Sequence, residues 1–282
     1  MTSDFVRPGV MTDPGKYASL FDGLPGDAAG VGRVVQGLMI HEFWVGAYGV
    51  ELTEEARDRV NLRRVEDVLA AIVAADDRPL DVAREPGARI ATNCRGFSVL
   101  AVAILRHHGV PARARCGFGA YFKDGWFEDH WVVEYLDGDT WKLLDAQIDP
   151  KQRDIVGIDF DLTDVPRDQF VIAGDAWTRV RAGTADPDRF GLTSINEAGD
   201  WWIAANLMRD AAALENLETL PWDLWGAMPE PEDTVDVELF DALAAATAGP
   251  SMADVRRLLT DDRLRVPDEV FNFQHKQLER VR

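Results

Sequence analysis

The sequence is poor in cysteine and in positive charge, and it has no long apolar run. Two cysteines among 282 residues do not make a disulfide framework. Thirty Lys and Arg stand against 49 Asp and Glu, and a surface with a net charge of −19 repels nucleic acid and anionic membranes. Apolar runs such as Val99 to Leu105 are far shorter than a membrane span. These features predict a protein with no nucleic-acid partner and no membrane partner.

The first ten residues, M-T-S-D-F-V-R-P-G-V, lack a basic region followed by an apolar core, so we expect no secretory signal. Reduced thiols suit the cytoplasm, and we expect a cytoplasmic protein. Hydrophobic residues make up 46% of the chain, which is enough for a sizeable core. Oligomeric state is not readable from the sequence.

Changes in composition divide the chain into three parts. Residues 1–30 are rich in Gly, Pro and Asp and are predicted to be loop-like. Residues 31–150 are predicted to form a core that begins with N-terminal helices. Residues 151–282 are predicted to be a mainly helical extension that packs on this core. The fold class expected from this order is α+β.

Local patterns predict several further elements. The apolar segment I-H-E-F-W around His41 has helical character, and Thr53 is a plausible N-cap. A strand is expected over residues 112–122, followed by a loop over 123–129. Helices are expected over 200–217 and 238–248, and Ser251 with Asp254 predicts a capping box that opens another helix.

A helix that carries Cys94 in its first turn is predicted after the cap residues Thr92 and Asn93. Apolar residues then follow at core-facing helical spacing, at Phe97, Leu100, Ala101, Ile104 and Leu105. Gly109 marks the stop. The unpaired N–H groups and the positive dipole of a first turn favour the nucleophilic thiolate, and these N–H groups would also stabilise an oxyanion. The structural alternative is a small buried cysteine that only packs.

A β-hairpin is predicted from His130 to Gln147, because two runs rich in β-branched and aromatic residues flank Asp137-Gly138. If Asp137 and Gly138 are the central turn residues, His130 faces Asp145 directly. The two Cβ atoms would then lie about 4.5–5.5 Å apart. A turn at Gly138-Asp139 would make the pair diagonal on the same face, and a three-residue turn would put the two side chains on opposite faces.

Thiol, imidazole and carboxylate in this order predict a catalytic triad. His130 would act as the general base toward Cys94 and would later protonate the leaving amine. Asp145 would fix the tautomer and orientation of the ring. The structural alternative is an exposed cross-strand His–Asp pair. We favour the triad because each group occurs where the mechanism needs it.

Residues from about 93 to 145 resemble the core of the transglutaminase-like superfamily. The matching segments are N-C-R-G-F-S, L-R-H-H-G-V-P-A-R-A, D-H-W-V-V-E-Y and W-K-L-L-D. The resemblance implies a papain-like cysteine-protease fold, in which a cysteine-bearing helix packs on an antiparallel sheet. It also implies the catalytic roles of Cys94, His130 and Asp145. H-E-F-W and L-P-W-D-L-W-G, outside this core, resemble a bacterial branch of the superfamily.

Three further residues are candidates for the oxyanion or substrate pocket: Asn93, Trp131 and His41. Trp131 follows the histidine where the superfamily usually has a small residue. A satisfied, partly buried histidine is the more probable interpretation of His41. No paired metal-ligand spacing is present, so we predict no metal site, and we treat Cys116 as a strand residue packed in the sheet.

The sequence therefore predicts cysteine-dependent acyl transfer or hydrolysis on a small-molecule or peptide amide, through a thioester and without a cofactor. Two alternatives are a non-catalytic scaffold or binding protein with the same fold, and a cysteine peptidase. Of the tryptophans after residue 150, most are expected in the core, although an aromatic wall near the site is a reasonable expectation.

Overall fold

The computed structural model describes residues 2–248 and 252–281 and confirms the α+β class, with 41% of the chain in helices and 17% in strands. The chain forms two compact units. The first, here called the cysteine unit, contains Thr2–Ala114 and Val132–Val165. The second, the histidine unit, contains Arg115–Trp131 and Pro166–Arg282. The predicted three-part division stays a prediction.

Two strands cross the unit boundary, β3 (Ala112–Gly119) and β4 (Phe127–Asp137). The other elements of the cysteine unit are η1 (Thr2–Phe5), η2 (Gly15–Phe21), α1 (Ala28–Leu38), β1 (Met39–His41), η3 (Val45–Tyr48), α2 (Glu54–Asp58), η4 (Arg59–Asn61), α3 (Val65–Ala75), η5 (Pro86–Ala88), β2 (Ile90–Thr92), α4 (Cys94–His107), β5 (Thr140–Leu144) and α5 (Pro150–Val156). None of the helices within 2–248 and 252–281 is long and apolar enough to cross a bilayer.

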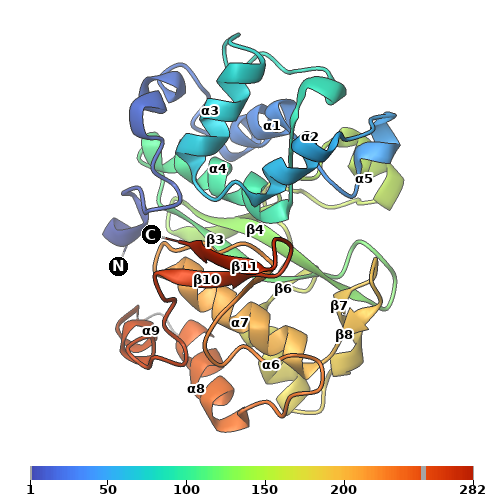
Figure 1. Ribbon diagram of the computed structural model, residues 1–282, viewed down its shortest axis with the longest axis vertical. Helices are drawn as coiled ribbons and strands as arrows, with labels where there is room; N and C mark the ends of the chain where they lie inside the picture. The colour runs from blue at the N-terminus through green and yellow to red at the C-terminus, as the bar shows by residue number, and fades with distance from the viewer. Residues whose placement is uncertain (1, 249–251, 282) are drawn as a thin grey trace. The chain divides into compact units, whose positions relative to one another are not determined.

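Helix α4 lies at the centre of the cysteine unit. It packs on α1 and α3, and Figure 1 shows the three helices side by side in blue, cyan and green. All its residues from Cys94 to Arg106 are buried. The predicted start and stop are confirmed, because Asn93 caps the helix and Gly109 follows it with φ +78°. The apolar spacing read from the sequence therefore corresponds to a real core helix.

The helix predicted for the segment around His41 is wrong, because this segment forms strand β1. It pairs in parallel with β2, so that Met39, Ile40 and His41 face Ile90, Ala91 and Thr92. The strand is buried along its whole length, and a continuous apolar run of this kind fits a buried parallel strand as well as a helix. The predicted cap is confirmed at Thr53, whose side chain accepts from the N–H of Ala56 at the start of α2.

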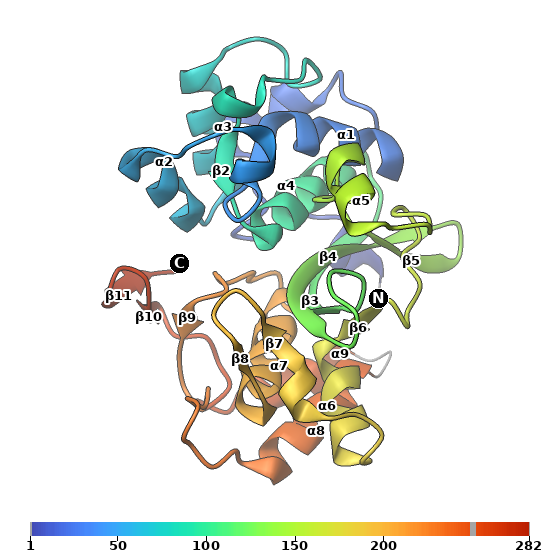
Figure 2. The same cartoon turned by 90° about the vertical axis from the view of Figure 1, so that its right-hand side faces the viewer.

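The predicted hairpin is present as β4 and β5, which Figure 2 shows beside each other. Its turn is one residue later than the favoured prediction. Asp137 pairs with Thr140, so the central residues are Gly138 and Asp139. Gly138 has φ +59°, and a glycine with positive φ at the first central position is typical of a type II′ turn. This register excludes directly facing positions of His130 and Asp145, and the diagonal arrangement stays a prediction.

The histidine unit contains more strands than sequence analysis anticipated. Its remaining elements are β6 (Phe170–Ile172), α6 (Ala173–Arg181), η6 (Pro187–Arg189), β7 (Phe190–Leu192), β8 (Glu197–Ala198), α7 (Asp200–Leu214), β9 (Asp223–Leu224), α8 (Val237–Ala248), α9 (Met252–Leu258), β10 (Glu269–Asn272) and β11 (Gln277–Arg280). Short strands such as β6 to β9 have too few residues for a period-two pattern to stand out. The predicted cap residue Ser251 lies outside the described residues.

One sheet has the strand order β6-β3-β4-β7-β8, with β5 paired to β4 as a side branch. Strand β7 pairs in parallel with β4, and β6 pairs antiparallel with β3. Helices α6, α7 and α8 pack on one another within the histidine unit.

Buried charge ties α7 to β3. Asp210 accepts from Nε and Nη2 of Arg115 at 2.9 and 2.8 Å and from the N–H of Cys116 at 3.0 Å. Cys116 is a buried strand residue, as predicted, and neither Cys94 nor Cys116 forms a disulfide.

Gly117 on β3 is predicted to be essential for the pairing with β6. A Cβ at this position would lie 2.3 Å from the carbonyl oxygen of Val171 and 2.9 Å from Cα of Ile172. Because both are backbone atoms, Gly117→Ala should lower the free energy of unfolding by about 1–3 kcal/mol. Urea denaturation measures this loss. Gly23→Ala is the control, since a Cβ there meets nothing within 4 Å. Equal losses in both variants would contradict the steric argument.

Candidate active site

Asn93 fixes the position of Cys94 at the start of α4. Its Oδ1 accepts from the N–H of Gly96 at 3.1 Å, and its Nδ2 donates to the carbonyl of Val60 at 3.2 Å. Gly96 allows the first turn to approach β2, because a Cβ there would lie 2.0 Å from Oγ1 of Thr92. Cys94 is the first residue of the helix and is 8% exposed. The side chain of Asn93 therefore has a structural role in the helix start, and its predicted oxyanion role stays a prediction.

Backbone hydrogen bonds hold the carboxylate of Asp145. Its Oδ1 accepts from the N–H groups of Gln147 at 3.0 Å and Ile148 at 3.3 Å, and the residue is 1% exposed. Gln36 of α1 reinforces this turn, because its Nε2 donates to the carbonyls of Ala146 and Ile148 at 3.3 and 3.1 Å. Hydrogen bonds to an ionised carboxylate fix its orientation as well as its charge.

A small hollow of the cysteine unit adjoins this turn. Its lining is Gln36, Met39, Ile40, Tyr48, Arg89, Phe97, Gln147, Asp149 and Gln152. Four polar side chains there form a chain of hydrogen bonds: Gln147 donates to Gln152 at 3.3 Å, and Gln152 donates to the Tyr48 hydroxyl at 3.2 Å. Tyr48 in turn donates to Asp149 at 2.7 Å. Burial, and then the bond to Asp149, raise the pKa of Tyr48. This chain holds the segment that follows Asp145.

His130 lies in β4 within the histidine unit and is 2% exposed. Three rings of the same unit surround its imidazole, with centroid distances of 4.9 Å to Phe122, 6.1 Å to Tyr121 and 6.2 Å to Phe170. The paired register of β4 and β5 ends at Val133 and Leu144, and the N–H of Asp145 donates instead to the carbonyl of Leu162 at 2.8 Å. Continuing the register by one position would set residue 145 opposite Val132, whose side chain shares a face of β4 with His130, because side chains two apart in a strand point to the same face.

The residues that flank His130 point to the other face of β4, because successive side chains in a strand alternate. Trp131 is one of them and does not share the face of the imidazole. It is 1% exposed, and its Nε1 has no hydrogen-bond partner among the residues that the structure describes. Asp129 accepts from Nε1 of Trp202 on α7 at 2.7 Å, and burial raises the pKa of Asp129. Trp202, one of the tryptophans after residue 150, thus contacts Asp129, the residue before His130.

Strand pairing brings His41 near the start of α4, because His41 pairs with Thr92, two residues before Cys94. Its Nδ1 accepts from the N–H of Phe43 at 3.2 Å, so the ring proton of the neutral form is on Nε2. The ring also packs against Phe43 at 5.4 Å, and Phe43 itself is 60% exposed. The pairing supports a position near the thiol, while the predicted pocket role stays a prediction.

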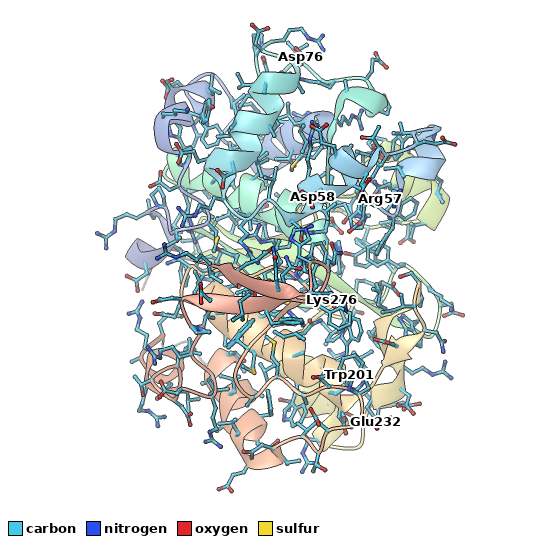
Figure 3. All side chains as sticks on the ribbon, viewed as in Figure 1. Arg57, Asp58, Asp76, Trp201, Glu232 and Lys276 are labelled. Atoms are coloured by element: carbon cyan, nitrogen blue, oxygen red, sulfur yellow. The ribbon has the colours of Figure 1, made fainter. Side chains whose placement is uncertain are left out.

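Sequence analysis missed Glu42, which follows His41. Its N–H donates to the carbonyl of Thr92 at 2.9 Å. Burial raises the pKa of Glu42 from its ordinary value of 4.5 to about 7, and Arg57 of α2 (labelled in Figure 3) opposes the shift. A glutamate after a histidine gives no sequence signal of burial, so only the strand pairing reveals it. Tyr121 and Phe122 were missed as well, although adjacent aromatics just before the histidine strand were a visible signal.

The titration of Glu42 predicts a pH dependence of stability. Its carboxyl stays neutral in the folded protein up to about pH 7 but ionises in the unfolded chain above about pH 4.5. The unfolded state therefore binds fewer protons in this window, and stability falls as pH rises. Between pH 5 and 8 the wild type should lose about 2 kcal/mol more than Glu42→Gln, since one pKa unit is worth about 1.4 kcal/mol and the group is partly solvated.

Urea denaturation of both proteins at the two pH values measures this difference. Glu51→Gln is the matched control, because Glu51 is exposed and should keep the wild-type dependence. The interpretation of Glu42 is wrong if Glu42→Gln and wild type show the same slope of stability against pH.

Within the part of the chain that the structure describes, no group of three or more His, Cys, Asp or Glu side chains is placed to hold a metal ion.

Comparisons with known proteins bear on the segment that contains the three candidate residues. The family model of the transglutaminase-like superfamily matches residues 55–146, which include Cys94, His130 and Asp145. A comparison with curated proteins gives no match.

Among solved structures, a protein from Cytophaga hutchinsonii, reported as a candidate cysteine protease, is 19% identical with a TM-score of 0.34. The match covers 62% of this chain and 48% of that chain, and a TM-score this low carries no argument. Residues 55–146 of this chain are therefore similar to the transglutaminase-like superfamily.

Proposed function

We propose that the protein is a cysteine-dependent enzyme that forms a thioester with the acyl group of an amide substrate. Cys94 is the nucleophile, His130 the general base and acid, and Asp145 the residue that orients the imidazole. The observation that supports the proposal is the register of the β4–β5 hairpin, which pairs Leu144 with Val133. Extended by one position, this register would bring Asp145 opposite Val132, on the face of β4 that also carries His130. Diagonal neighbours of this kind are within reach of an imidazole and a carboxylate.

The chemistry follows from the local setting of each residue. Cys94 begins a helix of 14 residues, and the first-turn N–H groups and the dipole favour its thiolate. Sγ attacks the carbonyl carbon, the carbonyl oxygen takes the negative charge, and the C–N bond then breaks as His130 gives its proton to the leaving amine. The N–H of Cys94 and the side chain of Asn93 would stabilise the oxyanion.

The thioester is resolved in the second half of the reaction. His130 takes a proton from water, in hydrolysis, or from an amine, in transfer, and the new bond to the acyl carbon releases the thiolate. Asp145 stabilises the imidazolium, because its carboxylate is fixed by two backbone N–H groups. The substrate is a small-molecule or peptide amide, so peptidase activity is one form of the same reaction. No step of this reaction requires a metal or an organic cofactor.

Trapping of the acyl-enzyme tests the proposal. Wild type, Cys94→Ala and Cys116→Ala are incubated with amide, peptide and ester libraries, and adducts are detected by intact mass and located by peptide mapping. Wild type and Cys116→Ala should carry the adduct on Cys94, and Cys94→Ala should carry none. Cys116→Ala is the matched control, because Cys116 is a buried thiol of strand β3. The adduct mass identifies the acyl donor.

The partners of the thiol have separate expected effects. His130→Ala and Asp145→Asn should each lower the rate of adduct formation by about 10²–10⁴-fold, which is the usual contribution of a positioned proton-transfer group. Circular dichroism controls for folding of each variant. A non-catalytic scaffold would show no adduct with any library, or the same labelling in folded wild type and folded His130→Ala. Either result would exclude the proposed enzyme.

A further inference from the structure

Two positions on one face of strand β3, beside the strand β4 that carries His130, are glycines without side chains. Gly117 and Gly119 are two residues apart and therefore lie on the same face of β3. A Cβ at Gly119 would lie 2.7 Å from the ring of Phe122 and 3.2 Å from that of Tyr121, and one at Gly117 would lie 3.0 Å from the ring of Phe170. At Gly119 aromatic rings occupy the space that a side chain would fill, and at Gly117 the backbone of β6 and the ring of Phe170 occupy it.

These three rings form an aromatic collar around His130, defined by Tyr121, Phe122 and Phe170. All three meet the imidazole edge to face, at interplanar angles of 90°, 73° and 72°. The collar lies wholly within the histidine unit. Phe170 is buried at 1% exposure, whereas Tyr121 and Phe122 are partly exposed. The loop from β3 to β4 therefore keeps aromatic surface in contact with both His130 and solvent.

The packing of the core does not depend on the partly exposed rings of Tyr121 and Phe122. On the other face of β3, Phe118 packs edge to face on Phe190 at 5.2 Å, and Phe127 stacks on Phe190 at 4.3 Å. Phe118 and Phe190 are fully buried and close that face of the sheet. Tyr121 and Phe122 instead pack beside Gly119 and remain partly exposed. Covering their surface with an apolar group would contribute about 25 cal/mol per Å².

The electrostatics of the collar favour an apolar occupant over a cationic one. His130 has to become an imidazolium during the reaction, and a second cation against the same rings would oppose that charge. The loop's own cation, Lys123, is placed over Trp126 at 5.6 Å from the ring centroid, and Trp126 is not a member of the collar. A charged donor group would also lose its hydration beside three hydrocarbon rings.

We propose that Tyr121 and Phe122 form a specificity subsite that binds a bulky apolar side chain of the acyl donor, adjacent to the reacting carbonyl. The proposal rests on the proposed function, because His130 is placed next to that carbonyl. It adds that donors with large aliphatic or aromatic side chains are preferred to small or charged ones. A side chain bound in an apolar pocket of this kind is worth about 10- to 200-fold in kcat/KM.

Acylation by a matched series of activated esters tests the subsite. The probes are the p-nitrophenyl esters of N-acetyl-glycine, -leucine, -phenylalanine and -lysine, and nitrophenol release gives kcat and KM. Wild type should prefer the leucine and phenylalanine esters to the glycine and lysine esters by about 10-fold or more. Phe122→Ala should reduce this preference by about 10-fold, chiefly by raising KM for the large donors. The pH–rate profile should stay unchanged.

Phe127→Leu is the matched control, since Phe127 stacks on Phe190 on the face opposite the collar and should keep the wild-type preference. Tyr121→Leu gives a second reading if Phe122→Ala does not fold. Two outcomes overturn the subsite: an unchanged preference in the folded collar variants, or an equal loss for all four esters with a shifted pH profile. The latter would mean that the rings only position His130. Absence of acylation of wild type by any ester would instead count against the proposed function.

Discussion

The register of the β4–β5 hairpin is the constraint on which the proposed chemistry depends. Asp137 pairs with Thr140, and every later pair follows from that one. A slip of one residue would move Asp145 to the other face of β4, because side chains alternate along a strand. Gly138, with φ +59°, fixes this register by allowing a tight turn that suits the twist of the two strands. A local backbone requirement at the turn thus sets the pairing as far as Val133 and Leu144, on which the proposed position of the carboxylate depends.

Hydrogen bonds to the backbone help to hold the candidate catalytic groups in place. Asn93 caps α4 and reaches the carbonyl of Val60, and Asp145 accepts from two N–H groups of its own turn. Gln36 adds two donated bonds from a different helix. A capped helix start and a clamped turn hold their side chains with little rotamer freedom, which is what a preorganised site needs.

The parts of the fold that were predictable from sequence have local causes. Asn93 next to an apolar stripe identifies the start of α4, and Asp137-Gly138-Asp139 identifies a hairpin. The central residues of the turn were misplaced by one, because Asp-Gly and Gly-Asp both suit primed turns. The prediction of a helix at His41 was wrong for a different reason. The burial of this segment comes from pairing with β2, some fifty residues away in sequence, and periodicity does not report such a partner.

Long-range packing also explains what the sequence did not indicate about the site. Glu42 has a raised pKa because the strand pairing buries it, and Tyr121 and Phe122 meet His130 because Gly119 lets them fold back. Composition suggested an aromatic wall near the site, with the tryptophans after residue 150 as candidates for it, and that expectation stays a prediction. The rings at His130 come from the loop before its own strand and from Phe170 of β6.

The pH dependence of Cys94 alkylation tests the central claim most directly. Iodoacetamide labelling of the Cys116→Ala protein, followed by mass spectrometry, gives the apparent pKa of the remaining thiol. The account predicts a pKa clearly below the ordinary cysteine value of about 8.5, and a shift when His130 is replaced by Gln. A thiol that titrates near 8.5 and does not respond to His130→Gln would contradict it.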